Sequence, residues 1–478
     1  MLAAIRRQIT RSDTRMSVRN RNIVKAQKKD CCGVTDILKQ DLARRLQSRQ
    51  AVVGVIGLGY VGLPLCIAIA ESGSRVIGLD IDPTKIVRLA KGESYIKHIP
   101  ADKIRNTNDT TRFMATSDFS RLKEVDAILI CVPTPLTSHF EPDLSFVVST
   151  GETVAKHLRA GQLIVLESTT FPGTTSQVLR PILEKSGLKN GVDFFLAFSP
   201  EREDPGNPDF STSQIPKVVG GDDPNARALA VALYEGFIAK TIPVSSTATA
   251  EAVKITENIF RAVNIALVNE LKVIYRKMGI DIWEVIDAAK TKPFGFMPFY
   301  PGPGLGGHCI PIDPFYLSWK AKEYGIATKF IELAGEINSN MPAYVIGELA
   351  IALDCQQKKG LNGSRILVLG VAYKKNIDDT RESPSLVLID LLEARGAVVD
   401  FYDPYVHVVP MTRQHANLAN RKSVAFGPDV IGSYDAVLIA TDHDDVDYAH
   451  VAKWGRLVVD TRNACGRNGI TGPHIISV

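Results

Sequence analysis

At residues 51–64 the chain reads Ala51-Val-Val-Gly-Val-Ile-Gly-Leu-Gly-Tyr-Val-Gly-Leu-Pro64, an apolar run that enters three glycines with the spacing Gly-x-Gly-x-x-Gly. A helical stretch follows, and the next apolar run, Arg75-Val-Ile-Gly-Leu-Asp80, ends in a carboxylate. Glycines in a strand-to-helix turn let a diphosphate approach the helix N-terminus, and an acid about twenty residues further on binds a ribose hydroxyl. The stretch therefore predicts a dinucleotide site. Asp80 favours NAD over NADP because it would repel a 2′-phosphate.

Three more apolar runs, residues 126–132, 162–168 and 194–198, are typical of strands in a parallel sheet that is buried on both faces. Each run ends in polar or turn residues. Ligands of open α/β sheets bind beyond the carboxyl ends of the strands. Thr169 and Glu201, which follow two of these runs, are therefore expected to face the nicotinamide and the reacting substrate.

The middle of the chain shows helical periodicity over residues 248–277 and again over 329–353, where Pro342 predicts a break. Lys254 and Asn258 lie four residues apart on one face of the first helix. This pair suits a developing oxyanion in a cleft, and it equally fits a solvated surface. Two such helices between α/β halves commonly provide a spine and a dimer surface.

A new α/β pattern begins near Gly363, with strands expected at residues 365–370, 397–402, 435–440 and 456–460 and a helix at 383–395. It lacks the Gly-x-Gly-x-x-Gly spacing, which favours a mononucleotide over a second dinucleotide. The sequence thus predicts two Rossmann-like, doubly wound α/β domains joined by a long central helical region. The expected boundaries are 1–33 for a basic arm without fixed structure, 34–245 for the NAD-binding domain, 246–355 for the central region and 356–478 for the second Rossmann-like domain.

Residues 299–314 form a stretch rich in glycine and proline that contains Cys309 and Asp313. Glycine removes side chains and proline fixes φ, so Cys309 would sit on a stiff surface made mostly of backbone. The alternative is a connector whose cysteine is simply buried. His308 precedes Cys309, but side chains of neighbouring residues usually point apart, which argues against a Cys/His dyad.

Composition narrows the class of protein. The chain has 478 residues, enough for two or three domains, and a net charge of +4, which argues against nucleic acid as the main partner. No apolar run is long enough to span a bilayer. Seven cysteines without metal-ligand spacing fit free thiols in a reducing compartment, so a cytoplasmic enzyme without a metal site is expected.

Several motifs occur in an order that resembles the UDP-glucose/GDP-mannose dehydrogenase family, over about residue 40 to the C-terminus. They are GLGYVGLP (57–64), ESTTFPGTT (167–175), SPEREDPGN (199–207), EAVKITEN (251–258), GPGLGGHCIPIDP (302–314) and KKNIDDTRES (374–383). The form GGHCIPIDPFYL is most similar to family members that act on UDP-N-acetylhexosamines, and UDP-N-acetylglucosamine is favoured.

The resemblance implies that the chain oxidises C6 of the sugar twice, from alcohol to carboxylate, with two NAD. Cys309 would be the nucleophile that forms a thiohemiacetal and then a thioester. Lys254 and Asn258 would stabilise the oxyanions. Asp313 and Thr169 would handle protons, and Glu201 would position the substrate or act as a base.

The same resemblance implies the binding residues and a homodimer or larger homo-oligomer. The residues expected to bind NAD are Gly57, Gly59, Tyr60, Val61, Gly62, Asp80, Lys85, Thr134, Ser168 and Arg381. Those expected to bind the UDP-sugar are Lys374, Arg462, Tyr300 and Gly306. From the sequence alone, Lys85 reads equally well as a solvated surface lysine.

Three alternatives remain at this point. The substrate could be UDP-N-acetylgalactosamine, UDP-N-acetylmannosamine, UDP-glucose or GDP-mannose, because epimers differ in few contacts. A two-electron dehydrogenase of the hydroxyacid type shares the cofactor domain, although the α/β pattern after Gly363 argues against it. A silent nucleotide-sugar sensor is opposed by the joint presence of Lys254, Asn258, Cys309 and Asp313.

Overall fold

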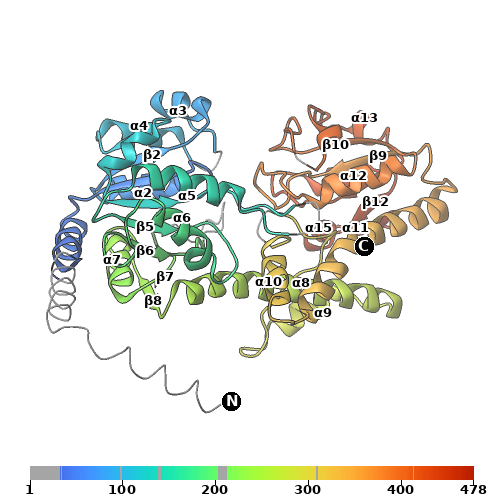
Figure 1. Cartoon of the computed structure of the whole chain (residues 1–478). Coiled ribbons are helices and arrows are strands. Elements are labelled where there is room, and N and C mark those ends of the chain that lie inside the picture. Colours follow the sequence, from blue (N-terminus) through green and yellow to red (C-terminus); the bar gives the residue numbers. More distant parts are fainter. Residues whose placement is uncertain are drawn as a thin grey trace, which may run out of the picture.

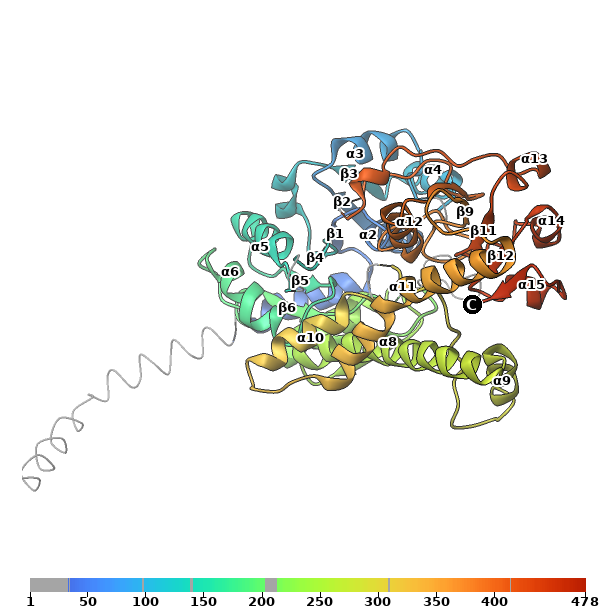
Figure 2. The ribbon, with the colours of Figure 1, turned by 90° about the vertical axis from the view of Figure 1, so that its right-hand side faces the viewer.

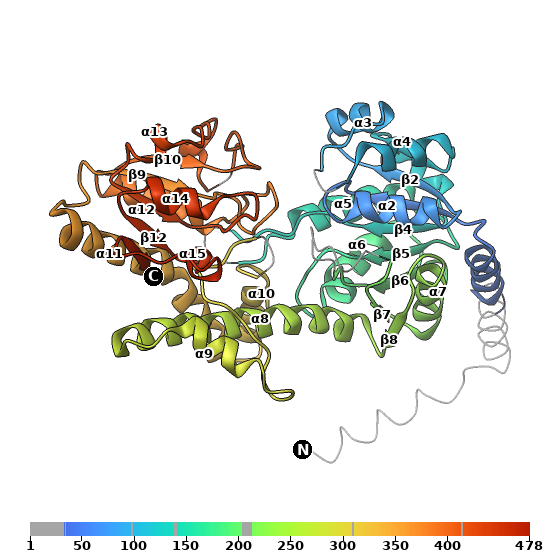
Figure 3. The same cartoon turned by 180° about the vertical axis from the view of Figure 1, so that it is seen from behind.

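The computed structural model describes residues 33, 35–96, 99–137, 141–202, 213–307, 310–412 and 414–478. The predicted basic arm, residues 1–33, lies outside this set except for Gly33. Two α/β units stand side by side, and long helices run beneath and between them (Figure 1). A helix over residues 35–47 lies at the outer edge of the first unit (Figure 3).

The first unit is built on an eight-stranded sheet with the order β3-β2-β1-β4-β5-β6-β7-β8. All neighbours are parallel except β6 and β7, which pair antiparallel and so depart from the expected all-parallel sheet. The strands are β1 (Val52–Ile56), β2 (Arg75–Leu79), β3 (Phe113–Thr116), β4 (Ala127–Ile130), β5 (Leu163–Leu166), β6 (Phe195–Phe198), β7 (Lys217–Gly221) and β8 (Thr241–Val244).

Helices cover both faces of this sheet because its central strands are apolar on both sides. One face carries α2 (Gly62–Glu71), α3 (Pro83–Ala90), α4 (Ala101–Asp109) and α7 (Pro224–Tyr234). The other carries α5 (Ser145–His157) and α6 (Arg180–Glu184), with a 3-10 turn at η2 (Phe119–Glu124) and a π turn at η3 (Thr175–Leu179). The doubly wound arrangement is confirmed.

The second unit is a five-stranded parallel sheet with the order β10-β9-β11-β12-β13. Its strands are β9 (Arg365–Leu369), β10 (Val398–Tyr402), β11 (Ala436–Ile439), β12 (Val458–Asp460) and β13 (Ile475–Ser477). One face packs on α12 (Pro384–Ala394) and on the end of α11 (Lys329–Gln357). The other packs on α13 (Pro428–Ile431), α14 (Tyr448–Trp454) and α15 (Ala464–Arg467), and a 3-10 turn, η4 (Ala416–Leu418), follows β10.

The two units are joined by α8 (Thr247–Met278), a continuous helix of 32 residues that packs along α11 (Figure 2). Two shorter helices, α9 (Ile282–Ala289) and α10 (Asp313–Lys322), flank the stretch that contains Cys309. The break expected at Pro342 is wrong, because α11 passes through that residue. Pro342 and its neighbour Met341 are buried, and this packing offsets the hydrogen bond that proline cannot donate.

Among the described residues, no helix combines the length and apolarity needed to cross a bilayer. The same part of the chain contains no group of three His, Cys, Asp or Glu side chains arranged to hold a metal ion.

Candidate active site

The glycine turn after β1 is shaped by close contacts of backbone with backbone. Gly57 has φ of 94°, and a Cβ there would lie 2.4 Å from the carbonyl oxygen of Cys131. A Cβ on Gly62 would lie 1.9 Å from the carbonyl oxygen of Gly57. A Cβ on Gly59, by contrast, would meet no protein atom within 4 Å. The space above Gly59, at the start of α2, is therefore open to a ligand, which fits the diphosphate of NAD.

Asp80 follows β2 and is tied to the glycine turn. Its Oδ2 accepts a hydrogen bond from the backbone N–H of Leu58 at 2.9 Å and pairs with Lys85 Nζ at 2.8 Å. Lys85 therefore lies against the carboxylate that was expected to bind ribose. Tyr60 and Val61 directly precede α2, so the residues predicted on this turn lie on one short backbone segment between β1 and α2.

The next strand ends are held by side chains from distant segments. Ser168 Oγ donates to the carbonyl oxygen of Val132 at 2.7 Å, and the hydroxyl of Tyr316, from α10, donates to that of Thr134 at 2.8 Å. Glu251 of α8 accepts hydrogen bonds from the backbone N–H groups of Gly173 and Thr175. Half-buried Thr169 thus lies in a segment that is hydrogen-bonded to α8 through Glu251 and packs on α10 through the rings of Phe171 and Trp319.

Glu201 belongs to a buried ion-pair network that the sequence did not reveal. Lys217 Nζ lies 2.7 Å from Glu201 Oε2 and 2.6 Å from Glu167 Oε2, and the Tyr234 hydroxyl donates to Glu167 at 2.5 Å. Burial opposes the charge on Lys217, but the two carboxylates outweigh this and raise its pKa. Burial raises the pKa of Glu167, while Lys217 acts against the rise. Lys217 therefore fixes the position of Glu201 at the edge of the sheet.

Asn258 and Asp313 meet at the start of α10. Asn258 Nδ2 donates to Asp313 Oδ2 at 2.5 Å, and both residues are buried, Asp313 with 3% of its surface exposed. Burial raises the pKa of Asp313 to about 7, and the nearby charge of Lys254 limits the rise. The structure thus brings together three of the residues predicted to carry the chemistry.

Cys309 and His308 lie outside the described residues, but the loop that precedes them in the chain is well packed. The backbone N–H of Gly307 donates to the carbonyl oxygen of Arg381 at 3.2 Å. A Cβ on Gly306 would lie 2.6 Å from Cβ of Tyr373, so this glycine lets the loop lie directly on the second unit. The loop is also attached to α8, because the backbone N–H of Gly302 donates a hydrogen bond to Asn269 Oδ1 at 3.0 Å.

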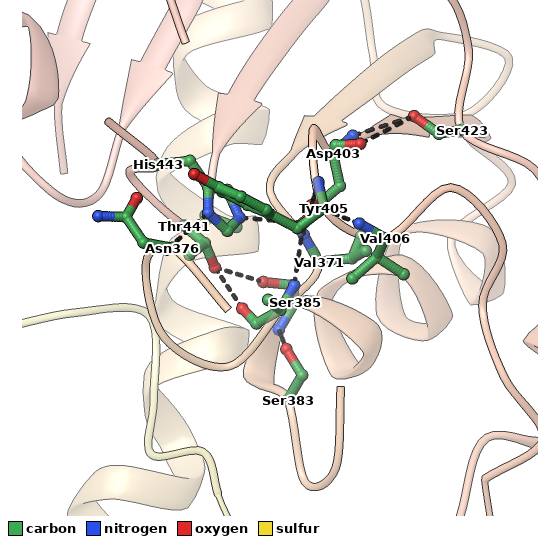
Figure 4. Close-up of polar contacts among 12 residues, drawn as sticks. Val371, Asn376, Ser383, Ser385, Asp403, Tyr405, Val406, Ser423, Thr441 and His443 are labelled. Atoms are coloured by element: carbon green, nitrogen blue, oxygen red, sulfur yellow. Dashed lines mark hydrogen bonds and ion pairs between the residues drawn. The ribbon is translucent and has the colours of Figure 1, made fainter. Parts of the chain in front are cut away.

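The ends of β9, β10 and β11 meet around a buried aspartate (Figure 4). Asp403 accepts hydrogen bonds from the N–H groups of Val371 and Ala372 at 2.7 and 3.1 Å, and His443 Nε2 lies 3.0 Å from it. The N–H of Asn376 donates to His443 Nδ1 at 2.9 Å. This network shapes the turn that contains half-buried Lys374.

Arg462 follows β12 at the same edge of the second sheet. Its Nε donates to the carbonyl oxygen of Ala440 at 3.0 Å, and a Cβ on Gly302 would lie 2.4 Å from its Nη1. Burial lowers the pKa of Arg462. Arg462 therefore lies where the second sheet meets the loop before Cys309.

Two other predicted residues lie in different surroundings. The Arg381 guanidinium lies 4.6 Å from the ring centroid of Tyr60 and pairs with Asp379, so it spans the two units at the cofactor turn. Tyr300 stacks on Trp283 of α9 with ring centroids 5.6 Å apart, and its hydroxyl donates to Asp287. The side chain of Tyr300 thus contacts α9.

Sequence reasoning also missed Lys272, which could have been found. Lys272 follows Lys254 by 18 residues, five turns of an α-helix, so the two share one stripe of α8 with Asn258 and Asn269 close to it. A polar stripe on an otherwise apolar helix was the available signal. No sequence pattern pointed to Lys217, because a lysine at the start of a strand is usually exposed.

Comparison with known proteins agrees with this arrangement. Three models of the UDP-glucose/GDP-mannose dehydrogenase family match the chain: the NAD binding domain at residues 51–238, the central domain at 248–340 and the UDP binding domain at 367–467.

Two curated relatives show the extent of the similarity. The chain is 35% identical to UDP-N-acetyl-D-glucosamine 6-dehydrogenase of Pseudomonas aeruginosa, over 82% of this chain and 90% of that one. It is 36% identical to UDP-N-acetyl-D-mannosamine dehydrogenase of Pyrococcus horikoshii, over 86% of this chain and 95% of that one. A solved structure of UDP-D-ManNAc dehydrogenase from Pyrococcus horikoshii superposes on this chain with a TM-score of 0.78 at 35% sequence identity. The superposition covers 86% of this chain and 96% of the Pyrococcus chain.

Proposed function

The chain belongs to the UDP-glucose/GDP-mannose dehydrogenase family, and from this we propose that it oxidises C6 of UDP-N-acetylglucosamine from alcohol to carboxylate. The cofactor is NAD, and the two oxidations would use two NAD per sugar. The uronate formed would serve as a precursor for surface polysaccharide. The observation that carries the proposal is the buried Asn258–Asp313 pair beside Lys254, at the end of the loop that contains Cys309.

The described residues divide the work as follows. NAD, when bound on the glycine turn, supplies the hydride acceptor for each oxidation. Asp313, whose pKa of about 7 lets it hold or release a proton near neutrality, removes the proton from the C6 hydroxyl through water, together with Thr169. The Lys254 ammonium and the Asn258 amide stabilise the negative charge that develops on the C6 oxygen.

The second oxidation needs an adduct of the aldehyde. The Cys309 thiolate attacks C6 of the aldehyde, and a C–S bond forms to give a thiohemiacetal. Loss of hydride from C6 leaves a thioester. Water then attacks the thioester, the C–S bond breaks, and the carboxylate leaves with the thiol restored. Glu201, held by Lys217, orients the substrate and accepts a proton from that water.

A second candidate substrate is UDP-N-acetylmannosamine, since the relative of that name is as similar as the one that acts on UDP-N-acetylglucosamine. UDP-N-acetylgalactosamine and UDP-glucose are further alternatives. All four share the C6 chemistry above and differ at the sugar hydroxyls or the acyl group.

The chain is further proposed to form a homodimer through α8. Phe260, Leu267 and Ile274 lie at intervals of seven residues and are between 44% and 49% exposed. This spacing puts them along one face of the helix, where a second copy would bury them. Leu267→Glu should halve the mass measured by sedimentation equilibrium, whereas an exposed polar position, Lys277→Glu, should not.

The test of the activity is the number of NADH formed per sugar consumed. Wild-type protein should yield two NADH per UDP-N-acetylglucosamine, and Cys309→Ala should stop before carboxylate. Cys355→Ala, which removes an exposed thiol on α11, is the matched control and should keep both steps. One NADH per sugar in both wild type and Cys309→Ala would refute the thiol mechanism. Turnover of an epimer alone would refute the choice of sugar.

A further inference from the structure

Lys272 lies on α8 with 3% of its surface exposed. Its Nζ is buried, and it forms no hydrogen bond with any residue that the structure describes. A buried ammonium group normally has a paired anion, because removing its hydration is costly. This suggests that Lys272 binds an anion that is not one of the described residues.

The charges around Lys272 point to an anionic partner. The charged groups that act on it are Arg462, Asp460 and Arg276. Arg276 is already paired with Glu348 at 2.8 Å. The oxygens of Asp460 accept backbone N–H bonds from Arg462 and Cys465, at 3.0 and 2.8 Å. Arg462 is half-buried, and although Asp442 and Asp460 act on its charge, it forms no ion pair with a described carboxylate. Neither Lys272 nor Arg462 is therefore paired directly with an anion among the described residues.

The surroundings of the two cations are those of the candidate active site. Asn269, one turn before Lys272, holds the N–H of Gly302, and the missing side chain of Gly302 makes room for the Arg462 guanidinium. Arg462 follows the carboxyl end of β12, the edge at which open α/β sheets bind ligands. Lys272 also continues the stripe of α8 that begins with Lys254 and Asn258, about 21 Å beyond Asn258 along the helix axis.

We propose that Lys272 and Arg462 together bind the diphosphate of the nucleotide sugar. The inference rests on the proposed function, since it assumes a nucleotide-sugar ligand, and it assigns to Lys272 a role that the motifs do not. Lysine and arginine are the side chains that bind diphosphate oxygens most strongly. Lys272 and Arg462 are near enough for the charge of one to act on the other, and two cations match the two negative charges of such a group.

The ionisation of Lys272 gives the proposal a distinctive signature. Burial, together with the charge of Arg462, lowers the pKa of Lys272 to about 7. At pH 8 most of the free protein therefore carries a neutral amine at this position. An incoming diphosphate stabilises the ammonium form, so binding should take up a proton at pH 8 and little at pH 6.

The experiment is titration calorimetry with UDP at pH 8, without NAD, in buffers of different ionisation enthalpy. Wild-type protein should take up close to one proton per UDP bound. Lys272→Met should abolish this uptake and weaken UDP binding roughly 10- to 100-fold, as expected for a lost charged hydrogen bond. Uridine, which lacks the diphosphate, should bind both proteins alike. Lys277→Met, an exposed lysine of the same helix, is the control and should match wild type.

Other outcomes would overturn the proposal. Equal loss of UDP and uridine affinity would mean that Lys272 shapes the pocket and does not contact the diphosphate. Unchanged UDP affinity in Lys272→Met would mean that the lysine is a buried neutral amine. Thermal melting shows whether each variant is folded, and Lys272→Gln replaces Lys272→Met if the latter is not. UDP binding requires no turnover, so failure here leaves the NADH stoichiometry as an independent test of the C6 oxidation.

Discussion

The Arg381 guanidinium of the second α/β unit lies over the ring of Tyr60, on the cofactor turn of the first unit, at 4.6 Å. The carbonyl oxygen of the same Arg381 accepts the N–H of Gly307, two residues before Cys309. One residue therefore contacts the glycine turn that is expected to bind NAD and the loop that contains the proposed nucleophile. We therefore expect occupation of the NAD site and the placement of this loop to be linked through Arg381.

Replacing this residue should weaken cofactor binding. Arg381→Ala removes a contact between cation and ring worth about 0.5–2 kcal/mol, so the KM for NAD should rise roughly 2- to 30-fold. Steady-state kinetics with varied NAD measures this effect. Lys375→Ala, which removes an exposed lysine of the same turn, should leave the KM unchanged. An equal effect of both changes would mean that the turn itself, and not the contact, matters.

Two glycines of the cofactor turn should respond differently to alanine. Gly59→Ala places a methyl group where no protein atom lies within 4 Å, so the variant should fold with wild-type stability and fail to bind NAD. Gly62→Ala places a methyl group 1.9 Å from a carbonyl oxygen and should destabilise the fold itself. Thermal melting with and without NAD separates the two cases. A Gly59→Ala protein that is still stabilised by NAD would contradict the placement of the diphosphate.

Asp313 should dominate the pH dependence near neutrality. Its pKa is raised to about 7 by burial, so an ionisation near pH 7 is expected in the profile of kcat/KM. Asp313→Asn should remove this ionisation and lower kcat. Asn258→Ala, which removes one donor, should cost roughly 100- to 1000-fold in kcat. Glu323→Gln, a change at the exposed residue that follows α10, is the control and should leave the profile intact.

The pH dependence of the free energy of unfolding offers a second test of the raised pKa of Asp313. The folded state of the wild type binds the Asp313 proton more tightly than the unfolded state does, whose carboxyl ionises near 3.8. The contribution of Asp313 to the free energy of unfolding is therefore largest below pH 4 and is lost as the pH rises through about 7. Asp313→Asn should remove this slope from urea melts, and an unchanged slope would contradict the shifted pKa.

The Lys217 network should be needed for folding as well as for activity. Lys217→Met leaves Glu167 and Glu201 buried without a cation, which should lower the free energy of unfolding by about 3–5 kcal/mol. Urea denaturation measures the change, and exposed Lys240→Met should have little effect. A loss below about 1 kcal/mol would show that the carboxylates are protonated or hydrated in the variant.

The sequence was sufficient for the central strands of both sheets and for the cofactor turn. Strands such as β4 and β11 are continuous apolar runs, and the periodicity leaves few alternatives. The structure adds β3, β7, β8 and β13, which were not identified from the sequence. β3, β8 and β13 are short edge strands that are partly exposed, so they lack a long apolar run. β7 is buried, but it begins with a lysine and ends in two glycines. The predicted helix break at Pro342 was wrong because the burial of this residue in the tertiary structure outweighs the tendency of proline to end a helix.

Residues of the candidate site could be predicted where a local sequence pattern, such as helical spacing or a motif, pointed to them. Asn258 and Asp313 were identified from helical spacing and from the motif that contains Asp313, and the structure places them in contact. The ion pair of Lys217 with Glu201 spans 16 residues and depends on how β6 and β7 pair, which no local pattern encodes. Long-range pairing of charges was the part that required coordinates.

The unbroken course of α8 has a consequence for how this sequence can change. Each residue of an α-helix turns the chain by 100° and advances it by about 1.5 Å. One residue inserted between Asn258 and Asn269 would swing Lys272 to a different side of the helix from Lys254. Seven inserted residues would nearly restore its direction but would move it about 10 Å away. The helix therefore fixes both the distance and the relative direction of these side chains, and we expect tolerated length changes to lie in loops and not in α8.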